Sequence, residues 1–463
     1  MKSQANRIFF LFLAFFVFFI YENMSANLSF SYLILSLSFL ISNYSILRKC
    51  RVEGVPYIAN GNLWVSVGIL LMFLIAPVAN YFFSESLPIV FARRDWQTAY
   101  PQVNLLVSMS ILSLCAGDCR TISVGFLRLP NQNFGVYRRT VPVALIAIIC
   151  WLTYYFVWAK SQGGFFSTVF ATRAQFGAAG ASSTNGYGFD AIYGALGALS
   201  VLIVISFSSH KALHRILIVL YFLLLLPSIF NGSRSKFVFY LVVLLIIKVS
   251  LGSRVTKRQV FIILLIVPLI IVAPRLYRGD STGLSSRALT EAYDVKNVIN
   301  TLTQEDLAMG PALSILELQR ESGRIPYLYG SSYIGAILKP IPRKLFQSKP
   351  IEFDKRLNSI IFPVESKNVG LSFSAISEPL VNFGGIGVIL FFYLLGMGNQ
   401  KFISMRNQGD LNGVLIHAWL TGFMFVLIRG NLTTDYQRAL FPLGTALIII
   451  KISPLARLNS KSN

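Results

Sequence analysis

The feature that most constrains this chain is a series of long apolar runs separated by polar connections. A helix that crosses the hydrocarbon layer of a bilayer needs roughly 20 apolar residues. Twelve runs approach this length, at residues 8–21, 28–47, 63–83, 99–117, 141–159, 190–208, 214–231, 236–252, 259–274, 379–398, 412–428 and 439–452. Hydrophobic residues make up 54% of the chain and charged residues only 13%, which excludes an ordinary soluble globular protein. We therefore predict an all-α polytopic membrane protein with about twelve transmembrane helices.

The positions of lysine and arginine predict how these helices are oriented. If the N-terminus is cytoplasmic, twenty basic residues fall in one set of short connections and eight in the opposite set. Cytoplasmic connections carry the excess of basic residues, so we expect both termini in the cytoplasm. The chain then divides into spans one to nine (1–274), one long outer loop (275–378) and spans ten to twelve (379–463).

Other features of the composition need no special function. The net charge of +22 is explained by the basic cytoplasmic connections beside an anionic leaflet, so we predict no nucleic-acid partner. The four cysteines lie outside the long loop and imply no disulfide framework. The stretch CAGDC (115–119) lacks the spacing and partners of a zinc site, so we predict no metal.

Basic residues on the outer face are harder to explain, because topology disfavours them there. The stretch NGSRSKF (231–237) places Arg234 and Lys236 between two apolar segments that are short for a span. These cations either anchor a tight turn at the headgroups, or line an outward cavity that receives a lipid-linked phosphate.

Other outer connections repeat this pattern. FARRDW holds Arg93 and Arg94, and FATRAQFG holds Arg173. In LIRGNLTTDYQR, Arg429 lies near Asp435, so an ion pair within the protein is the alternative there. Because a guanidinium binds two phosphate oxygens at once and stays charged when buried, we predict an anion-binding outer mouth.

The long loop contains two predicted helices. Apolar residues recur at helical spacing over 287–302. TQED (303–306) is a capping box that opens a second helix, which should stop at Gly323. Both helices are expected to lie on the span bundle or at the membrane interface. The following stretch, 327–350, is interpreted as irregular, and its tyrosines and cations suit either a sugar diphosphate or an interfacial belt.

Glu378 directly precedes Pro379 and the tenth span. A carboxylate at a helix N-terminus is favoured by the helix dipole, which is one explanation for it. The alternative is a membrane-edge carboxylate that orients or deprotonates an acceptor hydroxyl. Glycines 384, 385 and 387 are expected to allow close helix packing.

These motifs resemble those of the Wzy-like O-antigen polymerases, the oligosaccharide repeat unit polymerases. The resemblance rests on NGSRS at a span end, on YLYGSSY and KPIPRKLFQSKP in the long loop, and on SFSAISEPLVNFGGIGVILFFYLLG opening the next span. It covers residues 215–400, and the first 200 residues add only their spans. It implies the architecture shared by O-antigen polymerases and ligases, which is similar to that of the GT-C glycosyltransferases.

The resemblance also implies an activity. Such a protein transfers a growing chain from one undecaprenyl diphosphate carrier to the terminal sugar of a new unit, on the periplasmic face of the bacterial inner membrane. It would need neither a metal nor another cofactor. A chain-length regulator and a flippase would be its partners, besides membrane lipid and the lipid-linked oligosaccharide.

The resemblance suggests roles for particular residues. Glu378 would be the base or the residue that orients the acceptor, with Asp280 behind it. The diphosphate would be held first by Arg234. Further substrate-binding residues are Arg173, Lys236, Arg278, Tyr333, Arg343, Lys344 and Arg429.

Three other functions stay open. An O-antigen ligase of related architecture would have a histidine in the outer loop, whereas His210, His214 and His417 lie elsewhere. A lipid-linked oligosaccharide flippase would have short connections and charges deep within its spans. A noncatalytic assembly protein is the third alternative.

Overall fold

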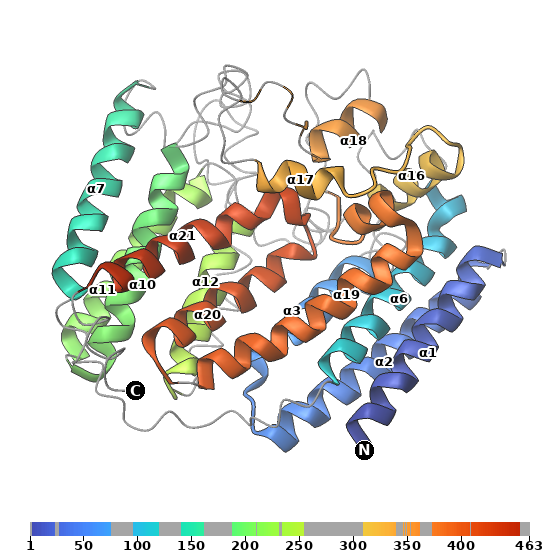
Figure 1. Cartoon of the computed structure of the whole chain (residues 1–463), viewed down its shortest axis with the longest axis horizontal. Helices are drawn as coiled ribbons and strands as arrows, with labels where there is room; N and C mark the ends of the chain where they lie inside the picture. Colours follow the sequence, from blue (N-terminus) through green and yellow to red (C-terminus); the bar gives the residue numbers. More distant parts are fainter. Residues whose placement is uncertain are drawn as a thin grey trace, which may run out of the picture. The chain divides into compact units, whose positions relative to one another are not determined.

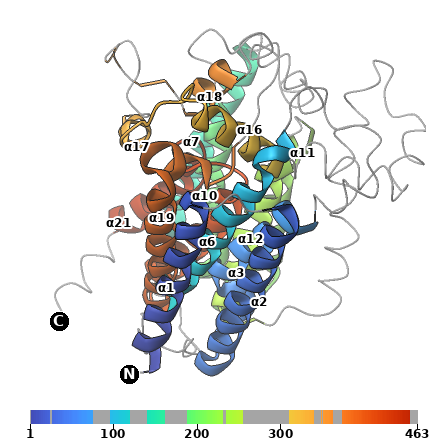
Figure 2. The same cartoon turned by 90° about the vertical axis from the view of Figure 1, so that its right-hand side faces the viewer.

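The described part of the chain is helical throughout. The computed structural model describes residues 2–23, 27–75, 96–119, 140–161, 188–209, 211–230, 234–253, 309–338, 346, 348, 350–351, 353–361, 373–407 and 409–453. No strand occurs among these residues. Figures 1 and 2 show the helices in two views. The predicted all-α class is therefore confirmed for the residues that the structure describes.

Eleven of the twelve predicted apolar segments coincide with helices, and the remaining one, 259–274, lies outside the described residues. The matching helices are α1 (Lys2–Asn23), α2 (Leu28–Glu53), α3 (Gly61–Ile69) with η2 (Leu70–Ile75), α6 (Tyr100–Asp118), α7 (Thr140–Ser161), α10 (Gly188–Ser209), α11 (Lys211–Phe230), α12 (Arg234–Ser250), α19 (Ser377–Asn407), α20 (Leu411–Leu427) and α21 (Leu432–Ile452). Among the described residues, five helices are long and apolar enough to cross a membrane: α1, α2, α6 with the turn η3 (Trp96–Ala99) before it, α7 and α19. This supports a membrane protein, and the count of twelve spans stays a prediction.

The chain forms two compact units. Unit 1 consists of Met1–Gly125, Val295–Lys401 and Met424–Tyr436. Unit 2 consists of Phe126–Asp294, Phe402–Phe423 and Gln437–Asn463.

The core of unit 1 is α6. Its residues are buried from end to end, and it packs along α1 and α2. Two glycines bring α6 against α19 backbone to backbone, because a β-carbon on Gly117 would lie 2.1 Å from the carbonyl oxygen of Tyr393, and one on Gly396 would lie 2.2 Å from that of Leu114. Small residues permit such close contact between membrane helices.

The second predicted loop helix is present as α16 (Met309–Glu321). It ends where expected, since Gly323 adopts a φ of 71° and donates its N–H to the carbonyl oxygen of Arg320 at 2.9 Å. The helix buries Leu313 and Leu316 and contacts α6 and η3, which confirms that it packs on the bundle. The predicted helix over 287–302 lies outside the described residues.

The interpretation of 327–350 as irregular was wrong in part, because α17 (Ser331–Ile337) lies within it. Tyr329 (φ 44°) and Gly330 (φ 84°) adopt left-handed backbone conformations that let the chain turn into this helix. Its Ser332 and Ala336 are buried. Local pattern is weak over seven residues, and burial against other elements decides the structure. A further short helix, α18 (Phe353–Ile361), follows.

Unit 2 contains α7, α10, α11 and α12. Here Trp419 of α20 is fully buried, and its indole packs against the rings of Phe239 and Tyr240 of α12. His417, which the sequence analysis placed inside a span, is also buried and its Nδ1 lies 3.0 Å from the hydroxyl of Ser250. Arg406 is buried and donates to the carbonyl oxygen of Ser250 at 2.8 Å.

Candidate functional site

Glu378 begins the candidate site. It lies in the first turn of α19 and is 1% exposed. Its carboxylate accepts a hydrogen bond of 2.9 Å from the hydroxyl of Ser332. Because Ser332 belongs to α17, the role of Glu378 extends beyond the first turn of its own helix. We call Glu378, Ser332, Asn382 and Tyr333 the Glu378 cluster.

Asn382 joins the two helices of this cluster. Its side-chain amide donates to the hydroxyl of Ser332 at 2.8 Å and to the backbone oxygen of Glu378 at 2.7 Å. Its side-chain oxygen accepts from the N–H of Gly330 at 2.7 Å. Asn382 has no exposed surface. These bonds satisfy a buried amide and hold α17 against the start of α19.

The tenth predicted span is not one continuous helix. Immediately after Asn382, Phe383 and Gly384 leave helical geometry, and Gly384 adopts a φ of 66°. A β-carbon on Gly384 would lie 3.3 Å from the hydroxyl of Tyr327, and one on Gly385 would lie 2.8 Å from the ring of Phe18. The expected close packing is therefore present at 385, whereas Gly384 provides the backbone conformation of a break.

Tyr333 completes the Glu378 cluster. Its ring stacks on that of Phe383, with 6.4 Å between the centroids and 18° between the planes. Burial raises the pKa of the Tyr333 phenol well above its ordinary value, and the negative charge of Glu378 raises it further. Two residues that the sequence analysis named separately, Glu378 and Tyr333, are thus close together, and the phenol remains a neutral hydrogen-bond donor at physiological pH.

A second carboxylate lies at the same end of unit 1. Glu317 of α16 has no exposed surface. Arg320 donates to both of its carboxylate oxygens, at 2.9 and 2.8 Å, and the hydroxyl of Tyr21 of α1 donates to it as well. These bonds to Glu317 raise the pKa of Arg320 above its ordinary value. This pair was not predicted, although its spacing of i to i+3 in a predicted helix signals it.

Arg429 lies in the turn between α20 and α21, at this end of the unit. It is half-buried. The neighbouring Ile428 accepts a backbone bond from Ala375, just before α19, at 3.3 Å. Tyr436 donates to the carbonyl oxygen of Ala336 in α17 at 2.6 Å. The turn that carries Arg429 is therefore tied to the elements that form the Glu378 cluster.

The other predicted site residues belong to unit 2 or lie outside the described residues. Arg234 and Lys236 lie in the first turn of α12, which belongs to unit 2, and their side chains are outside the described part of the chain. The remaining predicted residues lie outside the described residues altogether: Arg173, Arg278, Asp280, Arg343 and Lys344. The described residues contain no group of three or more His, Cys, Asp or Glu that could hold a metal ion.

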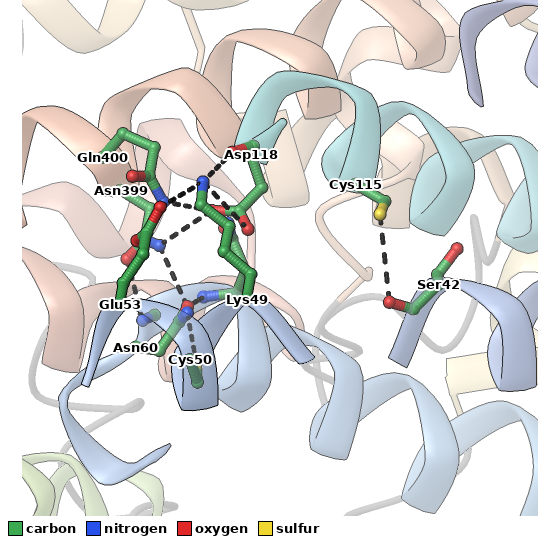
Figure 3. Close-up of polar contacts among 11 residues, drawn as sticks. Ser42, Lys49, Cys50, Glu53, Asn60, Cys115, Asp118, Asn399 and Gln400 are labelled. Carbon is green, nitrogen blue, oxygen red and sulfur yellow. Dashed lines mark hydrogen bonds and ion pairs between the residues drawn. The ribbon is translucent and has the colours of Figure 1, made fainter. Parts of the chain in front are cut away.

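A third polar group occupies the opposite end of α6 and of the unit 1 part of α19, and Figure 3 shows it. Asp118, 1% exposed, ends α6. Its carboxylate accepts from the amide of Asn62 in α3 at 2.7 Å and from that of Gln400 in α19. The ammonium of Lys49 in α2 lies 3.5 Å from its other oxygen. We call Lys49, Asn62, Asp118, Asn399 and Gln400 the Asp118 cluster.

The Asp118 cluster is linked through Asn399 to the amide of Asn60. The Asn399 amide donates to the side-chain oxygen of Asn60 at 2.9 Å, and its oxygen accepts from the N–H of Gly61 at 2.8 Å. Asn60 in turn donates to the sulfur of Cys50 at 3.0 Å. Asp118, which lies within CAGDC, was not predicted as a site residue, because its partners come from three other helices.

The geometry thus offers a buried carboxylate near a neutral phenol at one end of unit 1, and a buried aspartate paired with a half-buried lysine at the other. Comparison of the chain with known protein families, with curated proteins and with solved structures found no match.

Proposed function

We propose that this protein is a membrane glycosyltransferase that polymerises undecaprenyl-diphosphate-linked oligosaccharide units into a surface polysaccharide. It would act on the periplasmic face of a bacterial inner membrane. The motifs that resemble the Wzy-like polymerases support this function. The single observation that carries it furthest is that the buried Glu378, through its bond with Ser332, lies near Tyr333, so that two residues chosen from the sequence for this chemistry share one cluster.

The reaction forms one glycosidic bond and breaks another. A hydroxyl of the acceptor sugar attacks the anomeric carbon of the donor chain, and the bond from that carbon to the diphosphate oxygen breaks. The proton of the hydroxyl passes to the released diphosphate or to water. Negative charge grows on the leaving diphosphate, and fixed cations stabilise it. Of the predicted cations, Arg429 is the one whose position is described in the unit that holds Glu378.

Burial favours an orienting role for Glu378 over direct proton transfer. A general base must come within hydrogen-bond reach of the proton that it removes, and Glu378 is 1% exposed and bound to Ser332. In this proposal Glu378 is a positioning residue that fixes Ser332 and the neighbouring Tyr333. The phenol of Tyr333 would donate a hydrogen bond to a sugar oxygen or to the departing diphosphate.

Purified protein with a defined lipid-diphosphate repeat unit tests this function. A ladder of products identifies a polymerase, and a single transfer to a lipid acceptor identifies a ligase. Glu378→Gln should reduce polymer yield, whereas Glu321→Gln, which changes an exposed carboxylate at the end of α16, is the matched control. If the wild-type protein shows no activity in any of these assays, the result contradicts an enzymatic function and favours a noncatalytic assembly protein.

A lipid-linked oligosaccharide flippase is the second candidate, because the Asp118 cluster favours it. Ionisable residues buried among membrane helices often belong to transport or proton pathways, and Asp118, which pairs with the half-buried Lys49, is such a residue. Movement of the lipid-linked unit across vesicles without product ladders would select this function. Asp118→Asn should then reduce movement.

A further inference from the structure

An exposed apolar surface passes from α19 to α17. Ile334 and Ile337 of α17 are 56% and 77% exposed, and Tyr329 just before the helix is 79% exposed. Phe383, at the break in α19, is half exposed. We call these four residues the α17 apolar face. Exposed apolar groups that are this close together mark an interaction surface.

This face continues the lipid-facing side of α19. Ile386, Leu390 and Leu394 are each more than half exposed and are spaced four residues apart, so they form one stripe on the helix. The residues between them, such as Val388 and Phe392, are buried within unit 1. Phe383 lies at the break just before this stripe and is half exposed, and its ring stacks on Tyr333 of α17.

The length of α19 fixes the depth of α17 in the membrane. Lys401 is exposed on α19 and marks one boundary, because a lysine avoids the hydrocarbon. The helix is unbroken from Gly385 to Lys401, and these 16 residues at 1.5 Å a residue span about 24 Å, with Phe383 just before them. The hydrocarbon layer is about 30 Å thick. Phe383 and the α17 helix stacked on it therefore lie at the opposite boundary of that layer.

Lipid suits the α17 apolar face better than a sugar does. Two of the four side chains are isoleucines, which offer neither a ring for a sugar to stack on nor a polar group. Tyrosine and phenylalanine beside aliphatic residues are typical of the membrane interface, where tyrosine keeps its hydroxyl in the headgroup layer. Asn382 and Glu378 bind the opposite, buried side of α17 through Ser332, so the apolar side is held outward.

We infer that α17 is an interfacial anchor, seated at the boundary between headgroups and acyl chains of the leaflet opposite Lys401. The position of α17 sets the depth of the Glu378 cluster, which lies beside the anchor at the level of the lipid phosphates. The meaning of this depth for the substrate rests on the proposed function. A diphosphate linked to a membrane lipid would reach it without leaving that layer. The partner of the α17 apolar face is thus the bilayer itself.

Tryptophan scanning with brominated lipids tests the anchor. Ile337→Trp and Tyr329→Trp are reconstituted in phosphatidylcholine vesicles whose acyl chains carry bromine near the headgroup, midway, or near the chain end. The emission of the parent protein, which has five tryptophans, is subtracted. We expect the added emission to be quenched most by bromine near the headgroup. Leu390→Trp should be quenched most by bromine near the chain end.

A matched control lies on the neighbouring helix. Ser359 is exposed on α18 next to polar residues, and Ser359→Trp should resist quenching by every lipid. If Ile337→Trp and Tyr329→Trp behave like Ser359→Trp, the anchor is refuted. If instead a soluble oligosaccharide changes their emission and bromine does not, the face binds sugar and the inference is wrong.

The result is independent of the proposed activity. Quenching with no polymer formed would support the anchor and contradict the polymerase, whereas polymer formed with no quenching would do the reverse. Each variant is checked for a single folded species by gel filtration. Two scanned positions on α17 and its preceding turn guard against the failure of one variant to fold.

Discussion

Replacing Asp118 with alanine should destabilise unit 1 severely. The substitution removes the acceptor of two buried amides, those of Asn62 and Gln400, and the counterion of Lys49. A buried donor without an acceptor costs about 1–3 kcal/mol. The side chain of Lys49 is 17% exposed, so hydration of its ammonium offsets part of the free energy lost with the counterion.

The sum is about 3–5 kcal/mol, the range measured when one partner of a buried ion pair is removed. For a cooperative unit of about 245 residues, each kcal/mol lowers the melting temperature by about 2–4 °C. We therefore expect Asp118→Ala to melt roughly 6–20 °C below the parent. Asp118→Asn keeps the shape and one acceptor oxygen, so its loss should be about half as large.

Thermal unfolding of the detergent-purified protein, followed by intrinsic fluorescence, measures these shifts. Glu321→Ala changes the formal charge equally at an exposed position of α16 and should alter stability by less than about 0.5 kcal/mol. In a double-mutant cycle, Lys49→Met should lower the free energy of unfolding by less in the Asp118→Ala background than in the parent. Equal melting of Asp118→Ala and Glu321→Ala would refute the reasoning.

Three further predictions concern the packing of α6 and the Glu378 cluster. Gly117→Ala should lower the melting temperature, because its β-carbon would meet a backbone oxygen at 2.1 Å. Gly444→Ala, whose β-carbon meets nothing within 4 Å, should leave the melting temperature unchanged. Equal melting temperatures of the two variants would contradict the close contact. Ser332→Ala removes a donor from Glu378 and should lower the free energy of unfolding by about 1–3 kcal/mol, measured by thermal unfolding. Ser332→Thr keeps the hydroxyl and should be less destabilised. An alanine variant as stable as the parent would exclude that bond. The pKa of Tyr333 is raised, so the folded protein favours the neutral phenol. The stability that this preference adds is fully present below the pKa of an exposed tyrosine. It is lost as the pH rises through the higher pKa of the folded protein. The difference in near-ultraviolet absorbance between the parent and Tyr333→Phe should therefore show no phenolate at pH 10, and an ordinary titration there would refute the burial.

The sequence predicted the helices well, because long apolar runs and end signals are local properties. The stop of α16 at Gly323 needed only a glycine that follows a periodic segment. By contrast, α17 was missed, since seven residues carry too little periodicity to distinguish a helix from a turn. The break after Asn382 was missed for a related reason: Gly384 looks like any glycine of a packing surface until its φ is known.

The sites were less predictable than the helices. Glu378 and Tyr333 were both chosen, but their proximity depends on how α17 lies against α19, which no local pattern encodes. The Asp118 cluster joins side chains from four helices. Each of those residues, taken alone, resembles an ordinary polar residue near the end of an apolar segment. Only packing distinguishes them.

The break in α19 has a consequence for finding relatives. Position 384 requires glycine, since other residues avoid its backbone conformation, and the amide two residues earlier must reach both Ser332 and Gly330. Proteins that share this end of the molecule should therefore carry glutamate, then asparagine four residues on, then glycine two further on, at the start of a hydrophobic stretch. Where such a stretch is also preceded by a short helix with a serine at the position of Ser332, the same break and the same bonds should form.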